Sequence, residues 1–292
     1  MRNYLERFFE EFGYPQEAGE ALLTAFDQLS TPEVAGELDG ILSDYEADMM
    51  YEFRELLTRT AALSERAGVH EYTGKFVLLC CMSKQLKQFY ADTGICEEIW
   101  RTSMYDLKYK MLECQSVHHI WGTFVARWFC GFFQLWRFAF GKLQFEMVDF
   151  KSTYEKNGVS LQPDSKVLNT HIPRTGTRLD RESMRSSYAQ AADFYRERFG
   201  LDPVVFVCYS WLLFPRNKEI LSPQSNLYAF MSDYDIIEQK EYEDYGEVWR
   251  LFDVNYDGNP DHLPQDSSFR RGYADWIRKG IKTGYGYGVY VY

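Results

Sequence analysis

The side chains best suited to proton transfer in this sequence are His171 and Glu146. His171 ends an alternating apolar and polar segment, Val167–Ile172, just before Pro173. A histidine titrates at about pH 6.5 and can act as a general base, or at a strand end it can be a hydrogen-bonded structural residue. Glu146 lies in an aromatic segment, where a carboxylate is costly unless it is exposed or functional. Both are candidate bases, and His171 ranks first because it adjoins the polar loop that follows.

That loop is short and basic, and it reads Arg174, Thr175, Gly176, Thr177, Arg178. It precedes a helical segment that Asp180 is placed to cap. Free backbone N–H groups, the helix dipole and the arginines would together favour a phosphate group. The alternative is a solvated helix face on which the arginines pair with Asp180 and Glu182. Both interpretations of the loop stay open.

A second apolar segment, Val204–Phe214, carries Cys208, Tyr209 and Ser210 near its middle. Cys208 and His171 can in principle form a nucleophilic pair, but no helix N-terminus is expected at Cys208 to stabilise a thiolate.

These residues belong to one predicted strand–helix–strand unit. A helical pattern between the two apolar segments ends at Phe199, and Gly200 follows it. Such a crossover makes the two strands parallel, or nearly so, in one sheet. Ligands of such sheets gather at the carboxyl ends of strands and at helix N-termini. We therefore expect residues 171–178 to face residues 208–211.

The periodicity of the sequence changes near Thr123. Up to about residue 120, apolar residues recur at helical spacing, which predicts a helical bundle. Further on, residues 124–135 are aromatic and favour a strand, residues 137–150 alternate, and residues 154–164 are expected to form a loop. The expected fold is α+β or α/β, with a helical N-terminal domain over 1–122 and a mixed β-sheet domain with flanking helices over 123–292.

Composition argues against several classes of function. The 292 residues carry a formal net charge of −11, which opposes nucleic-acid binding and docking on anionic membranes. Residues 1–12 are charged and amphipathic, unlike a signal peptide, so we expect a cytoplasmic protein. The cysteines show no metal or disulfide spacing, and a calcium-loop pattern that begins at Asp253 fails at Pro264. We expect no metal.

Four segments in order resemble a bacterial two-domain acyltransferase-like family. They are FGKLQFE (140–146), HIPRTGTRLDRES (171–183), CYSWLL (208–213) and LSPQSN (221–226). The family has a helical N-acyltransferase N-terminal domain and a C-terminal domain of the GNAT type of N-acetyltransferase. The resemblance covers most of the chain, although the first half matches only by its helical layout.

The resemblance implies that acetyl-CoA or another acyl-CoA inserts its pantetheine between two parallel strands that splay apart. The strand that carries Thr170 and Ile172 and the loop 174–178 would bind this co-substrate, with the pyrophosphate at the loop. His171 or Glu146 would be the base, and Tyr209 or Ser210 would protonate the leaving thiolate. The acceptor would be a small-molecule amine or a peptide. The loop has a single glycine, Gly176, where the family is usually richer, and this favours an alternative: a non-catalytic GNAT-fold binding or interaction module.

Overall fold

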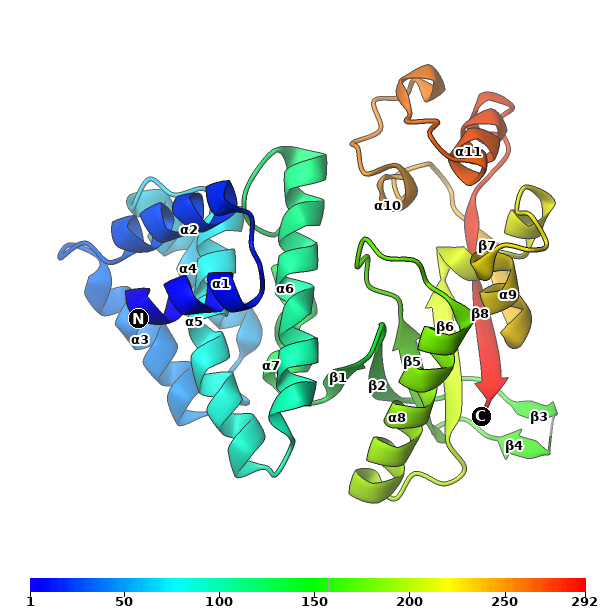
Figure 1. Ribbon diagram of the computed structural model, residues 1–292, viewed down its shortest axis with the longest axis horizontal. Helices are drawn as coiled ribbons and strands as arrows, with labels where there is room; N and C mark the ends of the chain where they lie inside the picture. The colour runs from blue at the N-terminus through cyan, green and yellow to red at the C-terminus, as the bar shows by residue number, and fades with distance from the viewer. Residues whose placement is uncertain (157) are drawn as a thin grey trace. The chain divides into compact units, whose positions relative to one another are not determined.

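The chain forms two compact units, Met1–Phe138 and Ala139–Tyr292, in a computed structural model that describes residues 1–156 and 158–292 (Figure 1). A helical first part followed by a mixed sheet with flanking helices confirms the predicted fold class. The domain boundary predicted between residues 122 and 123 stays a prediction.

The first unit is a bundle of helices around α5 (Glu71–Asp92). Every residue from Phe76 to Met82 is buried, so this helix has no polar face along that stretch. A helix of this kind is stable only when other helices surround it, and α5 contacts α1, α2, α3, α4 and α6. The bounds of these helices are α1 Arg2–Glu11, α2 Gln16–Leu29, α3 Ala35–Ala47, α4 Phe53–Arg66 and α6 Glu97–His118.

The strand predicted for residues 124–135 is wrong, because this segment forms helical turns. The 3-10 turn η1 (Ala126–Phe129) continues into α7 (Cys130–Phe133). Phe133 is fully buried, and its carbonyl accepts a hydrogen bond from the Tyr45 hydroxyl at 2.8 Å. The aromatic side chains fill the helical core of the first unit. Their burial there outweighs the weak preference of such residues for a strand.

The second unit is built on a six-stranded mixed sheet of order β1-β2-β5-β6-β8-β7. β5 and β6 run parallel, as predicted, and the pairs β2–β5, β6–β8 and β7–β8 are antiparallel. The bounds are β1 Arg137–Phe140, β2 Leu143–Asp149, β5 Lys166–His171, β6 Val205–Ser210, β7 Asp235–Glu241 and β8 Gly284–Val291. β6 is shorter than the predicted strand 204–214, because the 3-10 turn η2 (Trp211–Leu213) follows it.

Residues 154–164 were expected to form a loop, but they contain a small hairpin of β3 (Tyr154–Lys156) and β4 (Val159–Leu161). Tyr154 and Leu161 lie in one buried cluster with Val167 of β5 and Val207 of β6. The hairpin therefore covers the sheet face on which the odd-numbered residues of β5 and β6 lie. Strand side chains alternate between faces, so the even-numbered residues lie on the opposite face.

Helix α8 (Arg181–Phe199) covers that opposite face (Figure 1). Its Tyr188 ring lies 4.7 Å from the Phe206 ring of β6 and 5.6 Å from the Phe145 ring of β2, centroid to centroid. The predicted cap is confirmed, because the Asp180 side chain accepts the N–H of Ser183 at 2.8 Å. Gly200 ends the helix in the left-handed conformation that glycine adopts most easily.

Helices near the carboxyl end of the chain form a second, smaller core in this unit. Phe252, Tyr273 and Trp276 are buried together there, and Trp211 just after β6 stacks on Phe269 at 6.3 Å between ring centroids. The other helices of this unit are η3 Pro215–Glu219, α9 Asn226–Asp233, α10 Trp249–Phe252, η4 Pro260–His262 and α11 Ser268–Arg278.

Candidate active site

The parallel strands β5 and β6 are paired at only two positions, Leu168 with Phe206 and Asn169 with Val207. Beyond these positions each strand keeps its outer neighbour: β5 stays paired with β2 as far as His171, and β6 with β8 as far as Ser210. Within the described residues, the two strands thus part toward their carboxyl ends. The backbone groups on the facing edges are then available to a ligand that carries amides of its own.

His171 and Glu146, the two candidate bases, form one hydrogen-bonded pair. His171 Nε2 lies 2.9 Å from Glu146 Oε1, and the side-chain amide of Asn169 donates to the same oxygen at 3.1 Å. The His171 side chain is 21% exposed and that of Glu146 is 10% exposed. A carboxylate held against one ring nitrogen fixes the orientation of the imidazole and stabilises its protonated form. This arrangement is suited to accepting a proton at the point where the strands part.

Where β5 and β6 part, an opening forms between their carboxyl ends, and Tyr209 lies across this opening from His171. Both residues are two positions past the last pair, Asn169 and Val207, and therefore lie on the same sheet face. The Tyr209 side chain is 55% exposed. Burial of its hydroxyl and the neighbouring Tyr285 raise the pKa of Tyr209, which keeps the group protonated at neutral pH. Tyr209 is thus the hydroxyl-bearing residue of β6 on the face of His171, and its ring packs on Tyr285 of β8.

Ser210 is placed differently from Tyr209. It points to the opposite face by strand alternation, and its hydroxyl accepts the N–H of Leu212 at 3.1 Å at the start of η2. The structure thus brings Tyr209, but not Ser210, to the face that carries His171 and Glu146.

Cys208 does not meet the requirements of a nucleophile. It is buried on the face covered by α8, whereas His171 lies on the other face. Burial raises the pKa of the Cys208 thiol to about 12. A thiol that stays protonated at neutral pH is a poor nucleophile, so the possible Cys208–His171 pair is not formed.

The loop after β5 is exposed and turns at Gly176, whose φ is +73°. Thr175 and Thr177 stabilise the turn through their hydroxyls, which lie 2.8 Å apart. Arg174 forms an ion pair with Asp253, and Asp253 also pairs with Arg270 of α11. The loop is therefore tied to the segment between α10 and α11, and a phosphate that binds Arg174 must compete with a carboxylate.

Asp180 occupies part of the anion site expected at the start of α8. Its carboxylate accepts both the hydroxyl and the N–H of Ser183, and these bonds together with Lys142 hold the pKa of Asp180 well below its usual range. The Lys142 ammonium lies 3.1 Å from this carboxylate and donates to the carbonyl of Arg178 at 2.5 Å. The loop thus has a third cation beside Arg174 and Arg178.

The remaining predicted ligand residues, Thr170 and Ile172, flank His171. Thr170 is buried beside Tyr188 and Tyr234, so its backbone, and not its hydroxyl, faces the opening. Ile172 is half-buried and directly follows β5.

Sequence reasoning missed Asn169, Lys142 and Asp253. Asn169 lies two residues from both Val167 and His171, so strand alternation in the sequence already places it on the same face as His171. Lys142 and Asp253 reach the site only through tertiary contacts, and no local pattern marks them.

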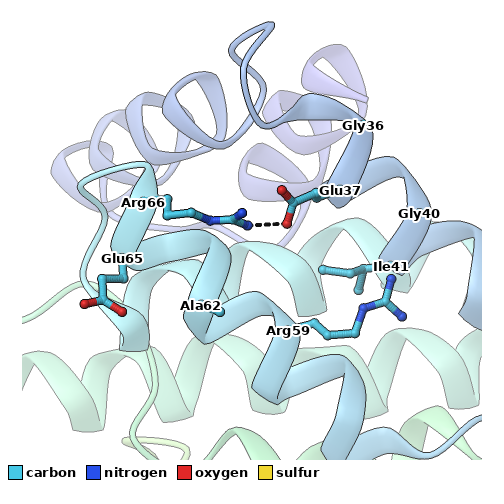
Figure 2. Close-up of a pocket in the computed structure, with 8 residues that line it drawn as sticks. All are labelled: Gly36, Glu37, Gly40, Ile41, Arg59, Ala62, Glu65 and Arg66. Carbon is cyan, nitrogen blue, oxygen red and sulfur yellow. Dashed lines mark hydrogen bonds and ion pairs between the residues drawn. The ribbon is translucent and has the colours of Figure 1, made fainter.

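A separate pocket of about 670 Å³ lies in the first unit between α3 and α4 (Figure 2). Its arginines are already paired, Arg66 with Glu37 across the pocket and Arg59 with Asp44. The residues that line it include no histidine, cysteine, serine or threonine. Its two carboxylates are Glu37, which is paired with Arg66, and Glu65 on α4, and the strands β5 and β6 belong to the other unit.

Within residues 1–156 and 158–292, no group of three or more His, Cys, Asp or Glu is arranged to hold a metal ion. None of the helices in the described part of the chain has the length and apolar character that a membrane span requires.

Two family models together match nearly all of the chain. The N-acyltransferase N-terminal domain matches residues 3–135, and the GNAT-like C-terminal domain matches residues 137–290. The chain belongs to this two-domain, GNAT-like family. The resemblance seen in the sequence is thereby confirmed. No curated protein matches the sequence.

Solved structures share the fold of this family member. An acyltransferase in complex with decanoyl-CoA and teicoplanin matches with a TM-score of 0.76 at 18% identity, covering 98% of this chain and 86% of the other. An acyltransferase mutant in complex with octanoyl-CoA gives the same values. An acyltransferase in complex with decanoyl-CoA gives a TM-score of 0.72 at 17% identity with the same coverage. At this level of identity the likeness shows the fold alone.

Proposed function

We propose that this protein is an acyl-CoA-dependent N-acyltransferase that transfers an acyl group to an amine by direct attack. The observation that carries the proposal is the parting of β5 and β6 after Asn169 and Val207, with His171 on one side and Tyr209 on the other. Membership of the GNAT-like family and acyl-CoA complexes of proteins with the same fold support it.

The residues of the opening can accept the first proton of the acceptor and donate one to the leaving thiolate. The pantetheine amides would pair with the edges of β5 and β6, which places the thioester carbonyl between His171 and Tyr209. The acceptor ammonium gives a proton to His171, whose imidazolium Glu146 stabilises. The amine nitrogen then attacks the carbonyl carbon, and the backbone N–H groups near Thr170 and His171 stabilise the oxyanion. The C–S bond breaks and Tyr209 protonates the thiolate. The attached nitrogen loses its second proton to solvent, and solvent returns a proton to Tyr209.

The phosphates of CoA would bind at the loop. Arg174, Arg178 and Lys142 are the cations there, and Arg174 exchanges Asp253 for a phosphate oxygen when the co-substrate binds. The backbone of Thr175, Gly176 and Thr177 completes the site. Arg–phosphate pairs are charge-assisted and stronger than neutral hydrogen bonds, which favours the exchange.

The acyl group and the acceptor are proposed in broader terms. The solved structures with this fold contain octanoyl-CoA, decanoyl-CoA or CoA, and two of them are complexes with teicoplanin or 10C-teicoplanin. We propose that this chain uses acetyl-CoA or a longer acyl-CoA, and that its acceptor is an amine on a small molecule or a peptide. The cytoplasmic location and bacterial origin stay predictions.

The activity is tested by incubating the protein with acyl-CoA thioesters of two to ten carbons and a panel of amines and amino peptides. Mass spectrometry of free CoA and of the amide product follows the reaction. We expect amide formation in proportion to CoA released. If the protein binds CoA but transfers no acyl group to any acceptor, the non-catalytic binding module is the correct alternative.

We expect Glu146→Gln to lower the acyl-transfer rate by about tenfold or more, because glutamine preserves the shape of the pair but cannot stabilise a protonated His171 by charge. Steady-state kinetics at saturating acyl-CoA measure the effect. Glu155→Gln, which removes an exposed carboxylate from β3, is the matched control and should leave the rate unchanged. A larger loss than that caused by removing the His171 imidazole would make Glu146 the base.

A further inference from the structure

A cluster of tyrosines lies on the sheet face that carries His171. In β8, Tyr285 and Tyr287 alternate with glycines, and the glycine side is filled: a Cβ atom on Gly286 would come within 2.3 Å of the Leu213 carbonyl oxygen. The tyrosines must therefore project to the other face, where Tyr209 of β6 lies. The rings of Tyr209 and Tyr285 have centroids 4.2 Å apart, and the Tyr242 ring lies 5.9 Å from that of Tyr285.

This cluster is open to solvent and is not part of the core. Tyr209 is among the most exposed large hydrophobic side chains in the described part of the chain, and Tyr242 and Tyr285 are half-buried. Exposed π faces held together on a rigid sheet are a surface to which a cation or an apolar ring binds readily.

One carboxylate adjoins these rings. The hydroxyl of Tyr285 donates to Glu238 Oε1 at 3.4 Å, and Glu238 is the register partner of Tyr287 in β7. Glu238 is exposed, and it forms no ion pair within residues 1–156 and 158–292. Lys240, the register partner of Tyr285, lies two residues from Glu238 on the same face and forms no ion pair with it in the described part of the chain. The aromatic faces and the Glu238 carboxylate together favour a ligand whose positive charge lies on the Glu238 side of Tyr285.

The cluster also lies at the place where an acceptor is needed. Tyr209 forms one side of the opening between β5 and β6, directly across from His171. Tyr285 packs on Tyr209 from β8, and Glu238 lies one strand further along the same face. A group bound on these rings would approach an inserted thioester from the side of β6.

We propose that Tyr209, Tyr242, Tyr285 and Glu238 form the subsite that binds the acceptor as a protonated primary amine. The proposal rests on the proposed N-acyltransferase function. In it, Glu238 attracts the ammonium group and the tyrosine rings contact its charge and adjoining carbons. The proton is then lost to the His171–Glu146 pair, so Glu238 and Tyr285 select and position the acceptor without taking part in the chemical step.

Direct binding of a probe amine tests the subsite without any acyl transfer. Benzylamine and benzyl alcohol have nearly the same shape, and only the amine is charged at pH 7. Their affinities for the full chain are measured by ligand-observed NMR titration at low salt. We expect Glu238→Gln to lower the affinity for benzylamine about threefold to fivefold, the usual effect of losing an exposed charge pair. The affinity for benzyl alcohol should be unchanged.

Two substitutions of Tyr285 separate the ring from its hydroxyl. We expect Tyr285→Leu to lower the affinity for benzylamine about threefold relative to the unchanged protein. Tyr285→Phe should retain most of the affinity, because the π face of the ring remains. Glu155→Gln on β3 removes the same charge away from the tyrosines and should bind benzylamine as the unchanged protein does. In acyl-transfer assays, Glu238→Gln should raise KM for the amine and leave kcat and the KM for acyl-CoA unchanged.

The proposed subsite is wrong if benzylamine does not bind the unchanged protein, or if the Glu238→Gln variant binds it equally well. It is also wrong if the substitution lowers the affinity for benzyl alcohol to the same degree. Equal weakening of the alcohol would show a structural role for Glu238. A failure of the proposed function is separate, because it would show as an absence of acyl transfer while benzylamine still distinguishes the variants.

Discussion

We expect His171→Gln to lower the rate of acyl transfer by roughly 10²–10⁴-fold, the usual effect of removing a positioned proton acceptor. Glutamine can keep a hydrogen bond to Glu146, so the fold and the affinity for CoA should be preserved. The pH–rate profile of the unchanged protein should have an acid limb, because a protonated imidazole cannot accept the proton of the acceptor, and the variant should lose this limb. The rate per folded molecule and its pH dependence are the quantities to measure.

A structural role for His171 predicts the opposite result. In that case His171→Gln lowers the melting temperature and leaves the rate per folded molecule nearly intact. Thermal unfolding and kinetics on the same preparation therefore decide between the two roles. The variant Glu146→Gln, measured in parallel, shows whether the two residues act as one unit, since their effects would then be far from additive.

We expect the double substitution Arg174→Ala with Arg178→Ala to weaken CoA binding more than it weakens folding. Each exposed arginine at a phosphate site contributes about 1–3 kcal/mol through charge-assisted hydrogen bonds, which is roughly fivefold to 150-fold per residue. The contribution of Arg174 to the binding free energy should lie near the lower end of this range, because Arg174 gives up its ion pair with Asp253 when CoA binds. Calorimetric titration with CoA at low salt measures the loss.

Arg196→Ala is the matched control for the loop variant. Arg196 lies in the last turn of α8, at the opposite end of that helix from the loop, and pairs with Asp193 on the exposed surface. Its removal changes the net charge without touching the proposed phosphate site. Unchanged CoA affinity in the double variant at low salt would remove residues 174–178 from the site.

The strand–helix–strand unit could be predicted from sequence because its signals are local. The cap at Asp180, the end at Gly200 and the alternation around His171 each involve residues close together in the chain. These signals set which elements form and which residues share a face. They also placed His171 at the end of the first strand. Tyr209 was expected near the middle of the second strand, but that strand ends earlier than predicted, at Ser210.

The pairing within the site depends on contacts that no local pattern sets. Alternation places Glu146 and His171 on faces of their strands, but only the register of β2 against β5 brings the two side chains together. The ion pair of Asp253 with Arg174 joins a loop to a distant helical segment. Residues 124–135 show the same limit, because their aromatic side chains are used by the helical core and not by the sheet.

A crystal structure of the protein with bound CoA tests the proposed site most directly. We expect the pantetheine to lie between β5 and β6, with its sulfur near His171 and Tyr209 and its phosphates at residues 174–178. Arg174 should then contact a phosphate oxygen in place of Asp253. CoA bound at another surface, with protein filling the space between β5 and β6 beyond Asn169 and Val207, would contradict the proposed CoA site.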